Sequence, residues 1–220
     1  MAEKQSPENK RLTVLVSSTV YGYEELLDRI YTLLTQFGYE VWMSHKGTMP
    51  VFSDRSAFEN CIAATEKCDL FLCIITPRYG SGVDGKTGLS ITHQELKKAI
   101  ELKKPRWLLA HDYVPASRLL LNDLGYKGKT GRKKLTLDNH CPVIDDIRLI
   151  DMYEEAILQS EKPPGDRQGN WVQKFSTDAD AMLFATAQFS RYQEVEAFIR
   201  ENFRNPDHIS RTIHDKRGRS

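Results

Sequence analysis

Short apolar, β-branched runs alternate with helical patterns along the first half of the chain. The apolar runs predict strands at Leu12–Ser17, Tyr39–Met43, Asp69–Thr76 and Arg106–Ala110. Apolar positions at helical spacing predict helices at Tyr23–Phe37, Ala57–Lys67 and Thr92–Leu102. Because a helix lies between each pair of strands, this order predicts an α/β fold with a doubly wound parallel sheet.

The second half of the chain has a weaker pattern. It predicts helices at Ser117–Leu124 and Ile150–Leu158, and a fifth strand at Trp171–Phe175 that is followed by a helix cap at Ser176 or Thr177. Helical spacing then continues to Phe203, with a break near Ser190. We expect residues 11–112 to form the α/β domain and residues 113–204 to complete it with mostly helical elements. Residues 1–10 and 205–220 are polar and are expected to be flexible.

The composition is that of an ordinary globular protein, and the net charge indicates which classes of binding partner to expect. The chain has 220 residues and a formal net charge of +1, so no global field favours nucleic acid or an anionic membrane. No apolar run is long enough to span a bilayer, and Met1–Arg11 lacks the apolar core of a signal peptide. These features predict a cytoplasmic protein without a membrane or nucleic-acid partner.

The four cysteines are predicted to be reduced thiols. None forms a C-x-x-C pair, and no secretion signal indicates an oxidising compartment. A metal site built from Cys61, Cys68 and histidines is the alternative, but their spacing matches no zinc motif, so we expect no metal and no cofactor.

Polar residues follow the predicted strands at their carboxyl ends, where ligands bind in doubly wound sheets. Ser17, Ser18 and Thr19 could hold a phosphate at the start of the first helix, or could simply cap that helix. Arg78 could pair with a phosphate, or could be a solvated surface arginine. The remaining candidates are Tyr21 and Tyr79, which could stack on a ring or cover the rim of the core, and His93, which could orient a substrate or be exposed on the first helical turn.

Glu95 is the candidate catalytic carboxylate. It lies in the first turn of the helix that follows the most apolar strand, beside the expected pocket. One carboxylate near an oxocarbenium-like ribose is enough for the cleavage of a nicotinamide–ribose bond, because the leaving group departs from a cationic ring. Thr92-x-x-Glu95 also matches a capping box, in which Glu95 would bind a backbone N–H.

Two further segments could bind anions, but other interpretations are favoured. Gly80–Thr87 matches the phosphate-binding motif G-x-x-x-x-G-K-T. However, three residues separate it from the strand, and the cap signals at Ser90 and Thr92 delay the helix that should hold the phosphates. Lys127–Lys134 is basic but has no aromatic residue within the cluster, so a solvated loop is expected there.

Three motifs in this order resemble a widespread Toll/interleukin-1-receptor-like (TIR-like) family found in bacterial defence and signalling proteins. They are V-S-S-T-V-Y-G at Val16–Gly22, R-Y-G-S at Arg78–Ser81 and G-L-S-I-T-H-Q-E at Gly88–Glu95. The resemblance implies a flavodoxin-like sheet of four to five strands, related to TIR domains that cleave NAD and to nucleoside deoxyribosyltransferases. In both relatives a glutamate in a place comparable to Glu95 serves N-glycosidic cleavage.

The resemblance also implies an activity and partners. The expected protein is an NAD glycohydrolase or ADP-ribosyl cyclase that uses NAD as its substrate and produces a nucleotide signal in antiphage defence. It is expected to form homo-oligomers on activation and to act on an effector protein that responds to its product. The alternatives are a nucleoside or nucleotide N-glycosidase, and a non-catalytic TIR-like interaction module in which Glu95 only caps its helix.

Overall fold

The computed structural model describes residues 11–191, with gaps at residues 81, 86, 139–140, 159–162, 164, 166 and 168. The two ends predicted to be flexible, residues 1–10 and 205–220, lie outside the described residues, as does the predicted helical extension to Phe203.

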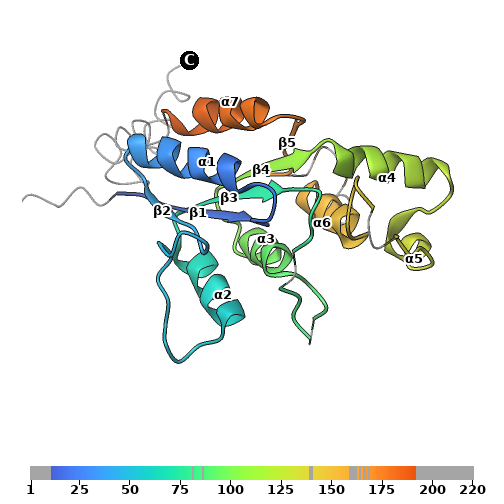
Figure 1. The fold of residues 1–220 in the computed structure, drawn as a ribbon, viewed down its shortest axis with the longest axis horizontal. Helices are drawn as coiled ribbons and strands as arrows, with labels where there is room; N and C mark the ends of the chain where they lie inside the picture. Colours follow the sequence, from blue (N-terminus) through green and yellow to red (C-terminus); the bar gives the residue numbers. More distant parts are fainter. Residues whose placement is uncertain are drawn as a thin grey trace, which may run out of the picture.

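One parallel sheet of five strands forms the centre of the fold (Figure 1). Its strands are β1 (Thr13–Ser18), β2 (Glu40–Trp42), β3 (Leu70–Ile75), β4 (Arg106–His111) and β5 (Val172–Phe175). Their order is β2-β1-β3-β4-β5, and all four pairings are parallel. This confirms the predicted doubly wound α/β fold, including the fifth strand. The chain order reverses between β1 and β3, which is where ligands bind in such sheets.

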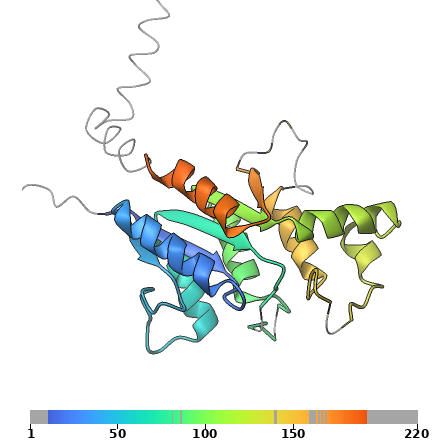
Figure 2. The ribbon, with the colours of Figure 1, turned by 45° about the horizontal axis from the view of Figure 1, so that its top comes forward.

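Helices cover both faces of the sheet. They are α1 (Glu24–Gln36), α2 (Ala57–Lys67), α3 (Ile91–Glu101), α4 (Tyr113–Asp123), α5 (Gly128–Arg132), α6 (Arg148–Ala156) and α7 (Asp178–Phe189). In Figure 1, α1 and α7 lie above the sheet, whereas α2, α3 and α6 lie below it. The turned view in Figure 2 shows α1 and α7 side by side, and the hydroxyl of Tyr39 donates to the carbonyl oxygen of Phe189 (2.9 Å) to join their ends.

The alternation of side chains along β1 decides which residues reach the site. Val14 and Val16 pack in the core between the sheet and the helices α1 and α7. Leu15 packs in the core on the opposite face, between the sheet and the helices α2, α3 and α6. Because neighbouring residues of a strand point to opposite faces, Ser17 shares the face of Leu15 and is directed towards α3.

Two predictions about the second half are wrong, one of them in part. Helix α4 begins at Tyr113, before the predicted Ser117, because the chain turns into the helix directly after β4. Lys127–Lys134 contains α5 and is not a loop throughout, and Arg132 is only 1% exposed, although the lysines of this segment are solvated as predicted. The Arg132 guanidinium pairs at 2.6 Å with both Asp151 and Glu154 of α6, partners that no local pattern could indicate.

Three further observations on the described residues concern membrane-spanning helices, metal ligands and cysteines. Among residues 11–191 outside the stated gaps, no helix combines the length and the apolar character needed to cross a bilayer. In the same residues, no three potential metal-binding side chains gather at one point. All four cysteines are free thiols, three of them buried.

Candidate active site

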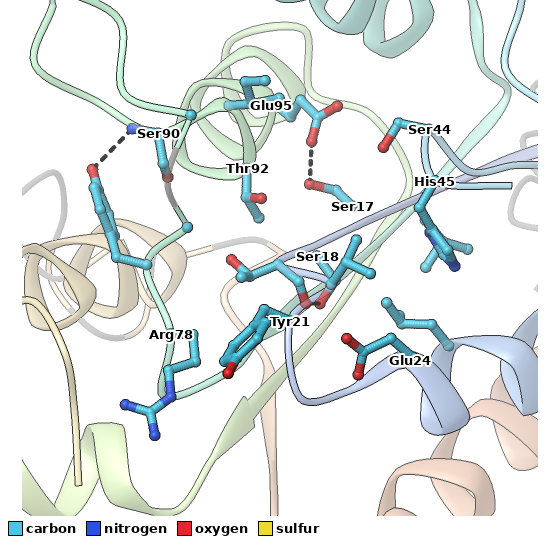
Figure 3. Close-up of a pocket in the computed structure, with 18 of the residues that line it drawn as sticks. Ser17, Ser18, Tyr21, Glu24, Ser44, His45, Arg78, Ser90, Thr92 and Glu95 are labelled. Atoms are coloured by element: carbon cyan, nitrogen blue, oxygen red, sulfur yellow. Dashed lines mark hydrogen bonds between the residues drawn. The ribbon is translucent and has the colours of Figure 1, made fainter. Parts of the chain in front are cut away.

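A pocket of about 720 Å³ opens at the carboxyl ends of β1 and β3. The loop after β1, the loop after β3 and the first turn of α3 form most of its wall, and the residues after β2 contribute Ser44 and His45. Figure 3 shows Glu95 and Ser17 at one end of this pocket, and Arg78 and Tyr21 at the other, with Ser18 between them. The pocket therefore lies at the carboxyl edge of the sheet, where the sequence predicted it, and next to the point between β1 and β3 at which the strand order reverses.

One end of the pocket holds a hydrogen bond between two residues far apart in the sequence. The hydroxyl of Ser17 donates to Oε2 of Glu95 at 2.5 Å (Figure 3). The distance is short for a hydroxyl and a carboxylate, as expected when the acceptor is charged. Glu95 is only 5% exposed, yet it lines the pocket, so a bound ligand could contact the carboxyl group directly.

Burial perturbs the acidity of this group. It raises the pKa of Glu95 to about 7, while hydrogen bonds from Ser17 and the Cys61 thiol lower the pKa and oppose part of that shift. The carboxyl group is therefore divided between its protonated and ionised forms near neutral pH. An acid whose ionised form is buried without a cation destabilises the fold. An acid with a strongly shifted pKa in a pocket is therefore typical of a functional site, where function and not stability accounts for its presence.

Glu95 does not cap its helix, so the predicted capping box is wrong. The N-cap of α3 is Ser90, whose hydroxyl accepts a hydrogen bond from the backbone N–H of His93 (3.3 Å). Helix α3 begins at Ile91, which places Glu95 beyond the position from which a glutamate could reach the cap. Helix capping therefore does not explain the presence of Glu95 at this position.

The hydroxyls after β1 do not cap α1 either. The N-cap residue of α1 is Tyr23, and no side chain caps that helix. Ser18 donates to the carbonyl oxygen of Ile74 (3.1 Å), and Thr19 lies against the loop after β3. The first turn of α1 carries Glu24 and Glu25, so its electrostatics do not favour a phosphate at the helix terminus itself.

Arg78, Tyr21 and Tyr79 line the pocket, as predicted from their place after the strands. Arg78 is half-buried, and its guanidinium makes one long contact of 3.5 Å with the carbonyl oxygen of Cys141. Tyr21 is 79% exposed and presents its ring at the mouth. Tyr79 is buried, and its hydroxyl is bound to His93 and Ser90.

His93 is placed differently from both expectations, since it is neither exposed nor among the pocket-lining residues that could orient a substrate directly. Its side chain is fully buried and contacts Tyr79 and Glu155 instead of lining the pocket. The sequence could not reveal this burial, because Glu155 belongs to α6 and the two residues meet only in the folded chain.

The segment with the phosphate-binding motif forms a different structure. Val83 pairs with Ser90 in an antiparallel bridge, and the N–H of Gly88 donates to the carbonyl oxygen of Asp84 (2.7 Å). The chain then reaches α3 only at Ile91. The described residues of this loop therefore turn back on themselves and do not lead into a helix that could hold a phosphate.

Sequence reasoning did not single out three residues that line the pocket. Glu24 comes from the first turn of α1, Thr92 from the first turn of α3, and Asp145 from the segment before α6. Asp145 accepts a hydrogen bond from the backbone N–H of Tyr79 (2.8 Å), which attaches that segment to the pocket wall. Glu24 stands next to the motif at Val16–Gly22 and Thr92 stands within the motif at Gly88–Glu95, whereas Asp145 carried no signal in the sequence.

Comparison with known proteins places the chain in a family whose function is not established. No curated protein matches its sequence. A family model described as a domain of unknown function, DUF4062, matches residues 13–136, a range that includes Ser17, Arg78 and Glu95. Since the match covers more than half of the 220 residues, the chain belongs to the DUF4062 family.

Proposed function

We propose that this protein cleaves the N-glycosidic bond between nicotinamide and ribose in NAD, with Glu95 as the catalytic carboxylate. The observation that carries the proposal is the buried Glu95, held by Ser17 inside a pocket at the switch point of the sheet. The TIR-like resemblance of the motifs around Ser17, Arg78 and Glu95 supports the same reaction.

The chemistry requires one negative charge at the reacting carbon. As the bond between C1′ and the pyridinium nitrogen breaks, its electron pair goes to nitrogen and leaves neutral nicotinamide. Positive charge then develops on the ribose, where the Glu95 carboxylate stabilises it or attacks C1′. Water completes the reaction to ADP-ribose and releases one proton. If a nucleophile of the bound ADP-ribosyl group takes the place of water, the product is a cyclic nucleotide.

Ser17 controls the orientation of the acid. Its hydrogen bond occupies Oε2 of Glu95, and the Cys61 thiol also donates to this carboxyl group, so both hold the acid in one orientation. A cationic pyridinium at this end of the pocket also favours the ionised form of Glu95 by direct attraction. The substrate itself therefore shifts the carboxyl group to the form that the reaction needs.

The size and polarity of the pocket support an extended nucleotide substrate. Its volume of about 720 Å³ lies in the upper part of the range for pockets that enclose drug-sized ligands. Arg78 lies away from Glu95 in Figure 3 and could neutralise a diphosphate, while Tyr21 could stack on a base. In this proposal the protein signals through its product in antiphage defence, acts as a homo-oligomer and serves an effector that binds the product.

The test is incubation with NAD, alone and with phage-infected cell extract as a source of the trigger, with chromatography of the products. Wild type should release nicotinamide, and Glu95→Gln should reduce turnover by at least a hundredfold, as the loss of one transition-state electrostatic group does. Glu25→Gln is the matched control, because Glu25 is an exposed glutamate in the first turn of α1 that is not among the residues lining this pocket. Equal turnover by Glu95→Gln and wild type would exclude the catalytic assignment.

One observation favours a second candidate function. Glu24 brings a negative charge to the pocket wall, where it would repel a phosphate but could accept hydrogen bonds from a ribose diol. A nucleoside or nucleotide N-glycosidase would use Glu95 in the same way on a smaller substrate. Release of free base from nucleosides, with NAD left intact, would identify this activity. Absence of turnover with both substrate classes under every trigger would favour a non-catalytic interaction module.

A further inference from the structure

A buried hydrogen-bonded chain connects three elements behind the pocket. His93 of α3 is fully buried, and both of its ring nitrogens have partners. Nδ1 lies 2.7 Å from the hydroxyl of Tyr79, in the loop after β3, and Nε2 lies 3.0 Å from Oε2 of Glu155, in α6. A buried histidine with two aligned partners is held in one orientation, which makes it suited to fixing the geometry around it.

The tautomer of His93 with its ring hydrogen on Nε2 gives all three hydrogen bonds one direction. The hydroxyl oxygen of Tyr79 accepts from the backbone N–H of Ser90 (3.3 Å). Burial raises the pKa of Tyr79, so the phenol keeps its proton at neutral pH and can donate it to Nδ1 of His93. Nε2 then carries the ring hydrogen and donates it to Glu155. The chain therefore runs in one direction from Ser90 to Glu155, with each donor satisfied.

Glu155 is the charged residue at the end of this series of hydrogen bonds. Burial favours its neutral form, but the hydrogen bond from His93 and the charges of Lys97 and Lys129 outweigh burial and lower its pKa to about 2. Lys129 contacts the opposite oxygen, Oε1, at 3.2 Å, so Oε2 is shared by His93 and Lys97. An ionised carboxylate holds the His93 ring more firmly than a neutral acceptor would.

The hydrogen-bonded chain is attached to the part of α3 that carries Glu95. Ser90 is the N-cap of α3, and its hydroxyl accepts the N–H of His93, so the same two residues join the helix cap to the chain. Glu95 follows His93 by two positions, and Ile91 and Thr92 of this turn also line the pocket. A movement of the Ser90–His93 turn would therefore move the Glu95 carboxylate relative to Ser17.

We propose that Tyr79, His93 and Glu155 are positioning residues that hold Glu95 in its reactive place, and that α6 is thereby part of the active site. The proposal rests on the proposed N-glycosidic activity. Helix α6 begins after the residues that the family model matches, so this support comes from the chain's own C-terminal segment. That segment is also attached at Tyr79, whose backbone N–H donates to Asp145 and whose ring faces the Arg148 guanidinium at 4.5 Å.

The test compares Tyr79→Phe and Glu155→Gln with wild type in the full chain. Tyr79→Phe removes the hydroxyl and keeps the ring, whereas Glu155→Gln removes the charge and keeps the shape. Lys129→Ala is the matched control, because it removes an exposed partner of Glu155 without breaking the chain. We expect Tyr79→Phe to lower kcat for NAD cleavage by up to about a hundredfold, the effect of a small displacement of a reacting group, with little change in KM. Glu155→Gln should have a smaller effect in the same direction, and Lys129→Ala should have none.

A readout that does not depend on turnover separates this proposal from the proposed function. The titration of the Glu95 carboxyl carbon, assigned by its loss in Glu95→Gln, can be followed by carbon-13 NMR. The titratable groups that face Glu95 are the thiols of Cys61, Cys68 and Cys73, which the variants leave in place. If this hydrogen-bonded chain positions Glu95, both variants weaken the Ser17 hydrogen bond and raise the midpoint of the Glu95 titration above that of wild type.

Each result decides one claim. A raised midpoint in a protein that does not cleave NAD supports the positioning chain and refutes the proposed function. An unchanged midpoint together with unchanged kcat in folded Tyr79→Phe and Glu155→Gln refutes the positioning chain. If Tyr79→Phe does not fold, Glu155→Gln alone gives the answer, because Glu155 is only partly buried and its replacement leaves the core intact.

Discussion

Replacement of Glu95 by glutamine should stabilise the folded protein at neutral pH, although it removes the proposed catalytic group. The pKa of Glu95 is raised from 4.5 to about 7 by burial. An acid with a raised pKa binds its proton more tightly in the folded state than in the unfolded state. Its contribution to stability is therefore fully present below the unfolded pKa, decreases as pH rises above that value, and is lost once pH passes the folded pKa.

The magnitude follows from the size of the shift. Each pKa unit corresponds to about 1.4 kcal/mol, so ionisation of buried Glu95 costs the folded state about 3 kcal/mol at pH values above its pKa. Glutamine has nearly the same shape and can accept the Ser17 hydrogen bond, but it does not ionise. The difference in unfolding free energy between Glu95→Gln and wild type should therefore grow by about 2–3 kcal/mol between roughly pH 5 and pH 8.

Urea unfolding at several pH values measures this difference. The comparison at one pH cancels the titration of the carboxylates that both proteins share, so the slope belongs to residue 95. Ser17→Ala should act in the opposite sense, because loss of its hydrogen bond raises the pKa of Glu95 further and destabilises the protein more at high pH. A difference between Glu95→Gln and wild type that stays constant across this range would refute the claim that Glu95 is a buried acid with a raised pKa.

Three further outcomes are expected. If Glu95 acts as a carboxylate, kcat/KM for NAD cleavage should rise with pH to a plateau, with a midpoint near the pKa of about 7, in a stopped assay over a buffer series. Arg132→Ala should lower the free energy of unfolding by about 3–5 kcal/mol, measured in urea, because it leaves the buried Asp151 without its cation, whereas Glu154 keeps its ion pair with Arg118. Native alkylation followed by mass spectrometry should label Cys141 and spare Cys61, since burial raises the pKa of the Cys61 thiol to about 12 and Cys141 is only half-buried.

The strands, most helices and the edge of the sheet that carries the site could be predicted from the sequence. β3 is buried along its whole length and α1 has a clear apolar stripe, so their signals are local and strong. Given four parallel strands with helical crossovers, the carboxyl ends must meet at one edge, and this is why Ser17, Arg78 and Glu95 could be grouped without coordinates. Helix α2 was predicted with its observed bounds for the same local reason.

Only the tertiary structure decided what those residues do. Thr92-x-x-Glu95 satisfies the pattern of a cap, yet Glu95 bonds to Ser17, which is 78 positions away along the chain. His93 and Arg132 looked like surface residues, yet each is buried against acidic partners on α6. A local pattern determines which element a residue joins, whereas burial, pKa and the choice of partner depend on the packing of helices that are distant in sequence. The sequence by itself therefore determined the sheet and its functional edge, and the packing of α3 and α6 determined the chemistry of the acid placed there.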